Sequence, residues 1–334
     1  MPYYRPVPRT DAARPEGALS LAGGWCWFDT VEVLERGQPP YLLPARDLAD
    51  AVAMRLSEPR PPVAGLDMGA PRLMGILNVT PDSFSDGGEH ADPAQALAHA
   101  HAMTAGGAAI LDVGGESTRP GAAPVTIDTE IARTAPVIAA IRAEIATPIS
   151  IDTRKTDVAR AAVRAGADLI NDVSGFTFDA GLAPFASGHA LPVCVMHAQG
   201  TPETMQVAPT YDDVALDVYD WLDGRIAALT ALGIPHGAII VDPGIGFGKT
   251  QAHNLRLLRN LSLFHGLGCP ILLGASRKRF IGDLSRTPEA KDRVPGSLAV
   301  ALGAVAQGVQ ILRVHDVAET RAALDLWQAV RCAD

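Results

Sequence analysis

Residues 74–88 read Met-Gly-Ile-Leu-Asn-Val-Thr-Pro-Asp-Ser-Phe-Ser-Asp-Gly-Gly. The apolar part predicts a short buried strand over residues 73–79, which a proline ends because proline cannot donate to a central ladder. The paired glycines then allow backbone turns that other residues resist. A strand that ends at Asn78 before a loop holding Phe84, two serines and two aspartates is typical of a functional site. An ordinary strand-to-helix connection would need fewer residues.

Strand-like segments recur beyond this stretch, with helical patterns between them. Residues 212–232 show one such pattern, with apolar side chains at helical spacing. Eight near-continuous apolar strands with crossover helices predict a closed (β/α)8 barrel, the TIM barrel. A doubly wound open sheet is the alternative, because periodicity alone does not exclude it. The predicted strands are residues 73–79, 108–114, 148–152, 169–173, 191–196, 238–242, 270–275 and 310–315.

Composition limits the possible functions of this chain of 334 residues. A formal charge of −9 argues against nucleic acid or an anionic membrane as the main partner. The four cysteines are widely spaced and fit no zinc or redox motif. The chain has neither a signal-like segment nor an apolar run long enough to span a bilayer, so we expect a cytoplasmic protein.

Residues 1–70 differ from the rest of the chain. They are rich in proline and arginine, with one possible strand or hairpin over residues 23–34 and weak helical spacing over residues 48–56. This segment is too short and irregular for an independent enzyme domain. We therefore expect an N-terminal extension, residues 1–70, packed on a barrel domain of residues 71–334.

Polar residues fall at the C-terminal ends of the predicted strands, which is where the active site of such a barrel lies. A single aspartate at a strand end is usually a structural cap. Eight polar strand ends that converge on one mouth favour a site instead. These strand ends carry Asn78, Asp112, Asp152, Asn171 with Asp172, His197, Asp242, Ser276 to Lys278, and Arg313 with His315.

The chemistry of these residues divides into two groups. Asp152, Asn171 and Asp242 offer acceptors and an amide that suit a flat heterocycle, because a carboxylate binds an N–C–N edge with two hydrogen bonds. A second group supplies cations for a phosphate-like group. The set predicts a nitrogen heterocycle that bears phosphate. The cations are Lys278, Arg313 and His315, with Arg119 as a further candidate.

Two other patterns carry less weight. The segment Gly-Ile-Gly-Phe-Gly-Lys-Thr at residues 244–250 resembles a phosphate-binding loop, but its first glycine stands one residue too close to the Gly-Lys-Thr. We expect a tight loop that brings Asp242 and Phe247 to the mouth, with Lys249 at its edge. His99 and His101 lie in an alanine-rich helical pattern, so we expect them to face solvent and not to bind a metal.

Taken in order, several separate motifs make the chain similar to the dihydropteroate synthase family. The match runs from about residue 72 to the C-terminus, and one motif alone would be weak support. The motifs are residues 78–88, 112–121, 150–153, 170–175, 196–197 with 200–206, 242–249, 276–278 and 313–316.

The resemblance implies a TIM barrel and an alkyl-group transferase of folate biosynthesis. The reaction would condense (7,8-dihydropterin-6-yl)methyl diphosphate with 4-aminobenzoate, giving 7,8-dihydropteroate and diphosphate. It would use Mg2+ as cofactor. A homodimer and susceptibility to sulfonamides would also follow from the family.

The resemblance also assigns residues to roles. The pterin would be held by Asp152, Asn171, Asp242 and Lys278, with Met196 and Phe247 packing nearby. The metal and diphosphate would be bound by Asn78, as the metal ligand, with Arg313 and His315. The aminobenzoate pocket would comprise Ser276, Thr118, Pro120 and Phe84. The residues expected to carry catalysis are Asp86, Arg119, Asp152, Asp242 and Lys278.

The expected mechanism has a physical basis. Diphosphate leaves readily once Mg2+, Arg313 and His315 neutralise its charge. The dihydropterin ring, with Asp152 and Asp242 beside it, stabilises the methylene cation that remains. The aromatic amine then attacks, so positioning and exclusion of water matter more than a strong base. Two polar loops, residues 79–90 and 115–126, would provide that exclusion.

Two rival functions share part of this pattern. A pterin-dependent methyltransferase has the barrel and the pterin-binding positions, but it has no use for a diphosphate site of Ser276, Arg313 and His315. A catalytically silent pterin-binding homologue would be expected to lose the loop residues or Asn78. The sequence departs from the common family pattern at Arg154, where tyrosine is frequent, and at Ala198, where methionine is frequent.

Overall fold

A computed structural model describes residues 2–79, 93–117, 124–200, 205 and 208–331. Eight parallel strands form one sheet in the order β11-β10-β9-β8-β7-β6-β13-β12. A parallel bridge between Val241 and Ile271 joins its two ends, so the sheet closes into the predicted (β/α)8 barrel, and the open-sheet alternative is wrong. The strands are β6 (Arg72–Asn78), β7 (Ala108–Gly114), β8 (Ile149–Asp152), β9 (Leu169–Asp172), β10 (Val193–Met196), β11 (Ile239–Asp242), β12 (Leu272–Leu273) and β13 (Ile311–Val314).

Prolines set where several strands begin. Pro148, Pro192 and Pro270 each lie just before a strand and accept a hydrogen bond from the neighbouring strand through their carbonyls. None of them can donate one in return. The strand predicted over residues 270–275 is shorter, since β12 comprises only Leu272–Leu273, and the backbone N–H of Ile271 donates to the side chain of Gln310 at 2.9 Å.

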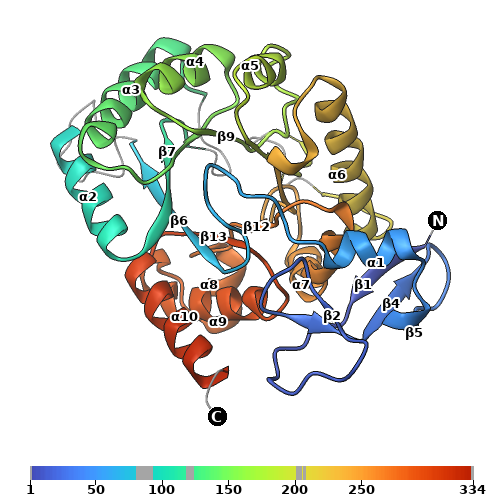
Figure 1. The fold of residues 1–334 in the computed structure, drawn as a ribbon. Helices are drawn as coiled ribbons and strands as arrows, with labels where there is room; N and C mark the ends of the chain where they lie inside the picture. The colour runs from blue at the N-terminus through green and yellow to red at the C-terminus, as the bar shows by residue number, and fades with distance from the viewer. Residues whose placement is uncertain (1, 80–92, 118–123, 201–204, 206–207, 332–334) are drawn as a thin grey trace.

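Helices surround the barrel, with the main apolar core between them and the strands (Figure 1). The helical pattern predicted over residues 212–232 is α6, whose N-terminus is capped by the side chain of Asp213. The helices are α2 (Pro93–Ala105), α3 (Ile127–Glu144), α4 (Thr156–Ala165), α5 (Leu182–Gly188), α6 (Val214–Ala231), α7 (Gln251–Arg259), α8 (Arg279–Ser285), α9 (Val294–Val305) and α10 (Val317–Arg331), with short 3-10 helices η3 (His236–Ala238), η4 (Leu261–Leu267) and η5 (Ala290–Arg293).

The first part of the chain forms a small sheet beside the barrel (Figure 1). Three antiparallel strands pair in the order β1-β4-β5, and Cys26, Phe28 and Val31 are buried in a core of their own. This part contacts the barrel through hydrogen bonds from Trp25 Nε1 to Val305 O and from Ser262 Oγ to Pro6 O, both 2.8 Å. The elements are β1 (Tyr3–Pro6), β2 (Leu19–Ser20), β3 (Trp27–Phe28), β4 (Thr30–Leu34), β5 (Tyr41–Pro44), η1 (Ala45–Asp47) and α1 (Asp50–Ser57).

The segment that leads into β6 closes the N-terminal end of the barrel. Val63 and Met68 are buried against the residues that line the start of the strands, among them Met74 and Ile240. This end is opposite to the end where the polar residues lie. Cys194 lies in β10 and Cys269 lies in the turn before β12. Both are as fully buried as Cys26. None of the described helices is long and apolar enough to cross a membrane.

Candidate active site

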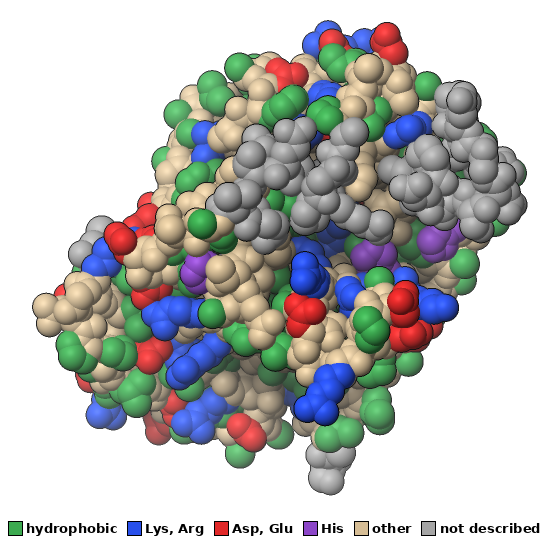
Figure 2. Space-filling view, turned by 180° about the vertical axis from the view of Figure 1, so that it is seen from behind, with side chains coloured by type: hydrophobic (Ala, Val, Ile, Leu, Met, Phe, Trp, Pro, Cys, Tyr) green, Lys and Arg blue, Asp and Glu red, His purple; other side chains and the backbone are tan. Residues whose placement is uncertain are grey.

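Strand register places three of the predicted site residues, Asn78, Asp152 and Asn171, on neighbouring strands at the mouth. Asn78 pairs with Gly114, Gly114 with Asp152, and Asp152 with Asn171. Met196 and Asp242 form the corresponding pair on β10 and β11. Because neighbouring residues in a parallel sheet share a face, these side chains converge on one region. Lys, Arg and His side chains lie on this side of the molecule, with Asp and Glu side chains among them (Figure 2).

Arg313 connects two carboxylates at the centre of this region. Its Nε lies 2.5 Å from Asp112 Oδ2, and its Nη2 lies 2.8 Å from Asp152 Oδ2. The amide of Asn171 also donates to Asp112, at 3.3 Å. The sequence suggested Asp112 only as a strand-end residue and gave it no role. Its position two residues before Gly114 was the available signal, because alternate residues of a strand share a face.

Burial shifts the titration of the charged groups at the mouth. Loss of water raises the pKa of Asp152 and of Asp242, and the charges of Arg313 and Lys278 respectively oppose this rise. Burial lowers the pKa of Lys278 to about 8, although the carboxylate of Asp242 acts in the opposite direction. Perturbed acids and bases that face one another in this way are typical of an active site.

The loop after β11 holds Lys278. The Lys278 ammonium group donates to the carbonyl of Ile245 and lies 4.7 Å from the ring centroid of Phe247. Asp242 Oδ1 accepts from the backbone N–H of Gly244 at 2.7 Å, which turns the chain sharply after the strand. Asp242, Phe247 and Lys278 are thus brought together, as the sequence predicted.

The position predicted for Lys249 is wrong. Lys249 was expected at the edge of this loop, but its side chain turns inward and only 3% of the residue is exposed. Its ammonium nitrogen lies 2.9 Å from His197 Nδ1. The expectation that the two helix histidines face solvent is confirmed, because His99 and His101 are exposed, and His101 pairs with Glu144 at 2.9 Å.

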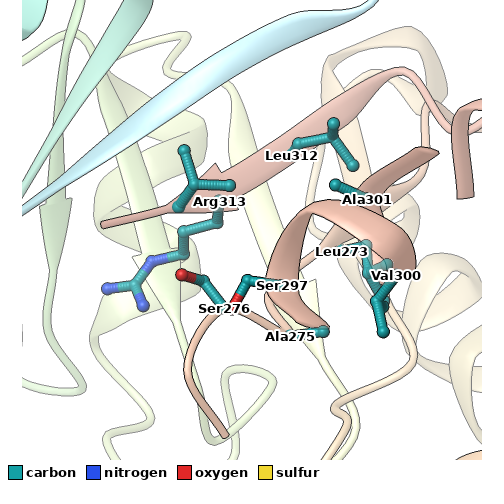
Figure 3. A pocket seen from close by; sticks show the side chains of 9 residues that line it. Leu273, Ala275, Ser276, Ser297, Val300, Ala301, Leu312 and Arg313 are labelled. Carbon is teal, nitrogen blue, oxygen red and sulfur yellow. The ribbon is translucent and has the colours of Figure 1, made fainter. Parts of the chain in front are cut away.

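Ser276 and His315 lie together at the ends of β12 and β13. The Ser276 hydroxyl lies 3.1 Å from His315 Nδ1 and accepts from the His315 backbone N–H at 3.2 Å. A small pocket adjoins them, lined by Leu273, Ala301 and other apolar side chains of β12, β13 and α9. The guanidinium of Arg313 extends away from this pocket, and Ser276 stands between the two (Figure 3).

A buried cluster of ions lies beside Asp152, and the sequence gave no indication of it. Lys155 Nζ lies 2.6 Å from Glu130 Oε2 and 3.2 Å from Glu116 Oε1. Arg154 binds Glu116 at 2.9 Å and its guanidinium lies 4.4 Å from the ring centroid of Phe178. Two cations and two carboxylates balance here, and Arg154, the departure from the family pattern, has a defined place among them.

Five predicted site residues fall outside the described residues. They belong to the two polar loops that the sequence associated with the aminobenzoate pocket and with catalysis. They are Phe84, Asp86, Thr118, Arg119 and Pro120.

The side-chain oxygens of Asn78 and Asp152 at the mouth fit a metal ion that takes most of its ligands from the bound substrate and from water. A methyl group added to Gly114 would lie 3.6 Å from Asn78 Oδ1 and 3.8 Å from Asp152 Oδ2, so both oxygens border the same space. Among the described residues, no group of three His, Cys, Asp or Glu could hold a metal ion. Mg2+ often takes one or two protein oxygens and completes its shell with phosphate and water.

Known proteins are similar to this chain in sequence and in fold. A family model described as "Pterin binding enzyme" matches residues 74–315. The dihydropteroate synthase of Escherichia coli (strain K12) is 47% identical over 268 residues, which are 80% of this chain and 94% of that protein.

Solved structures agree. Xanthomonas albilineans dihydropteroate synthase with 4-aminobenzoic acid is 46% identical, with a TM-score of 0.76, over 81% of this chain and 97% of that chain. The same organism's enzyme in complex with 7,8-dihydropteroate is 43% identical, with a TM-score of 0.73, over 80% and 97% of the two chains.

Proposed function

Since the chain belongs to the family of pterin binding enzymes, we propose that it is a transferase that makes 7,8-dihydropteroate. It condenses (7,8-dihydropterin-6-yl)methyl diphosphate with 4-aminobenzoate and releases diphosphate. The relatives that are 46–47% identical over most of the chain carry the name of this activity. Two related structures hold 4-aminobenzoic acid and 7,8-dihydropteroate.

The observation that carries the proposal is the arrangement of Arg313 between Asp112 and Asp152, with Asp242 and Lys278 nearby. The carboxylates offer acceptors for the N–H groups of a pterin, and a carboxylate paired with an N–C–N edge forms two charge-assisted bonds. Asn171 donates its amide to Asp112 and so presents its carbonyl oxygen as a further acceptor. Met196 and Phe247 supply apolar surface for the faces of the ring.

The diphosphate lies towards the cationic rim in this proposal. Arg313, His315 and Ser276 come from adjacent strand ends and can donate to phosphate oxygens. Asn78 would contribute an oxygen to Mg2+, with Asp152 beside it. When bound, Mg2+ would offset the charge of the departing diphosphate. Arg313 and Lys278 add fixed positive charge in a region of low dielectric, where each charge acts more strongly than in water.

The protein residues have separate tasks in the reaction. Asp152 and Asp242 hold the pterin and favour positive charge on it as the bond to diphosphate breaks. The amine of 4-aminobenzoate attacks the methylene carbon and forms the new C–N bond, and the proton it loses passes to solvent or to diphosphate. Phe84, Asp86, Thr118, Arg119 and Pro120 are proposed to bind 4-aminobenzoate and exclude water. A sulfonamide would compete for the same pocket.

The rival functions fit this arrangement less well. A pterin-dependent methyltransferase would not need the phosphate-binding donors of Ser276, Arg313 and His315, which come from adjacent strand ends, with Ser276 and His315 3.1 Å apart. A silent pterin-binding homologue has no reason to retain an inward-facing Asn78 together with these cations. We further propose that the protein acts in the cytoplasm, as a homodimer.

A diphosphate-release assay tests the proposal. Purified protein is given the dihydropterin diphosphate with and without 4-aminobenzoate, each with Mg2+ or with a chelator. We expect release and 7,8-dihydropteroate only when both 4-aminobenzoate and Mg2+ are present. Lys278→Ala and Asp152→Ala should each abolish turnover while the protein stays folded. Absence of product that depends on 4-aminobenzoate would refute the proposed function.

A further inference from the structure

Lys249 is a buried lysine among neutral acceptors. Its ammonium nitrogen lies 2.9 Å from His197 Nδ1, 2.9 Å from Gly244 O, 3.0 Å from Phe247 O and 3.3 Å from His197 O. These four partners include no carboxylate. Burial lowers the pKa of Lys249 well below its ordinary range, and the nearby charge of Asp242 opposes this. Burying an ammonium group is unfavourable unless other groups compensate for its lost water.

The partners of Lys249 belong to two different loops. His197 follows β10, whereas Gly244 and Phe247 follow β11. Their backbones touch, because a side chain on Gly244 would come within 1.8 Å of His197 O, and one on Gly248 within 2.4 Å of Gln199 O. Lys249 therefore ties the two loops together from inside, and the Tyr211 hydroxyl adds a second link by donating to Gly248 O at 2.8 Å.

The loop that Lys249 holds is also the one that positions the proposed pterin residues. It starts at Asp242, whose carboxylate is fixed by the N–H of Gly244. In the middle of the loop, Ile245 O accepts a hydrogen bond from Lys278. The ring of Phe247 lies beside the Lys278 ammonium group. Each of these contacts depends on the path of residues 243–248, which Lys249 binds at two carbonyls.

We propose that Lys249 is a positioning residue for pterin binding. It fixes residues 243–248 against the end of β10, and through them it holds Phe247 and Lys278 in the geometry that receives the ring. His197 has a defined part in this, because its Nδ1 lies 2.9 Å from the Lys249 nitrogen and accepts from it in the tautomer that carries the ring proton on Nε2. The inference rests on the proposed function.

The test compares Lys249→Met with Lys291→Met, a lysine on the exposed surface of η5. Binding of 6-hydroxymethylpterin is measured by calorimetry, together with Tm, kcat and the KM for each substrate. We expect Lys249→Met to weaken pterin binding at least tenfold at a temperature where the variant is folded, with the KM for 4-aminobenzoate changed less than threefold. Lys291→Met should bind as the unaltered protein does.

A purely structural lysine would give a different result. If Lys249→Met lowers Tm but leaves the pterin dissociation constant within twofold, the inference is refuted. A pair of variants at His197 covers the case in which Lys249→Met does not fold. His197→Asn keeps an acceptor near the Nδ1 position and should bind pterin normally, whereas His197→Phe removes the acceptor and should bind several-fold more weakly. Equal binding by both variants would also refute the inference. Failure of the unaltered protein to bind pterin would refute the proposed function instead.

Discussion

Arg313 shows how a single side chain depends on partners that are distant in sequence. The sequence identified it as a cation at a strand end, which is where the structure has it. The sequence could not say that Asp112 and Asp152 would share its charge, because these contacts span 201 and 161 residues. Asp112 was therefore named without a role. Burial of Lys249 was missed for the same reason, since its acceptors come from two loops that meet only in the folded chain.

Replacing Asp112 with asparagine tests the charge balance around Arg313. We expect Asp112→Asn to lower the unfolding free energy by about 3 kcal/mol, because removing one partner leaves buried charge uncompensated. Turnover should fall more than tenfold as Arg313 shifts towards Asp152. Asp325→Asn is the control, because it breaks an exposed pair with Arg321 whose carboxylate side is 64% exposed, and it should cost less than about 1 kcal/mol. Urea unfolding and the diphosphate assay measure both effects, and equal losses for the two variants would contradict the argument.

His265 makes stability depend on pH. It is fully buried beside Gln307 O, 2.9 Å from Nε2, and burial together with the charge of Arg60 lowers its pKa to about 3. An unfolded histidine titrates near 6.5. As pH falls below about 6.5, the unfolded chain gains a proton that the folded chain refuses. This group therefore removes about 1.4 kcal/mol of stability per pH unit until pH approaches 3.

His265→Gln should remove that dependence, because glutamine can still donate to Gln307 O and does not titrate. Unfolding free energies at pH 7, 6, 5 and 4.5 would be compared between the two proteins. We expect the variant to lose less stability on acidification, by about 1.4 kcal/mol for each unit below pH 6. Parallel curves for the two proteins would show that the folded chain protonates His265 as readily as the unfolded chain does.

At the scale of elements, the barrel strands were predictable because each is a nearly continuous apolar run between helical patterns. Their exact ends were less so. The prolines before β8, β10 and β12 delay the start of these strands, and β12 also ends earlier than predicted, so that it has two residues. The pairing of β1 with β4 was not predictable, because the choice of partner strand depends on tertiary packing more than on local sequence.

Gly224 and Gly244 should respond in opposite ways to substitution by alanine, because one lies in an exposed helix and the other in a tight loop. Gly224 lies on the exposed side of α6 with no atom near the position of an added methyl group. Gly224→Ala should raise the unfolding free energy by about 0.5–1 kcal/mol, because glycine disfavours a helix interior.

Gly244 has a φ of 68°, and its added methyl group would meet His197 O. Gly244→Ala should lower Tm and weaken pterin binding, as thermal melts and calorimetry would measure. A stabilised Gly244→Ala would disprove the close contact between the two loops.

On the scale of the whole molecule, the small sheet β1-β4-β5 lies beside the barrel, whereas the active site lies at the barrel mouth. The Escherichia coli enzyme and the Xanthomonas albilineans structure are covered over 94% and 97% of their lengths, yet only about four fifths of this chain takes part. The remainder includes the N-terminal elements that pack on the outside of the barrel, while Val63 and Met68 fill its lower end. This arrangement leaves the mouth to the strand ends and to the loops that follow them.

Cys26, Cys194 and Cys269 are buried, so their reactivity can report local unfolding of the parts of the molecule around them. Burial raises the pKa of Cys26 and Cys269 to about 12 and also raises the pKa of Cys194, so each thiol resists alkylation while its surroundings stay closed. In a Cys332→Ser background, mild urea followed by iodoacetamide and peptide mass spectrometry should label Cys26 before Cys194, because the core around Cys26 is the smaller. Simultaneous labelling would mean that the small sheet and the barrel open as one cooperative unit. The order in which the thiols react would then show how far the small sheet can separate from the barrel while the barrel core around Cys194 stays closed.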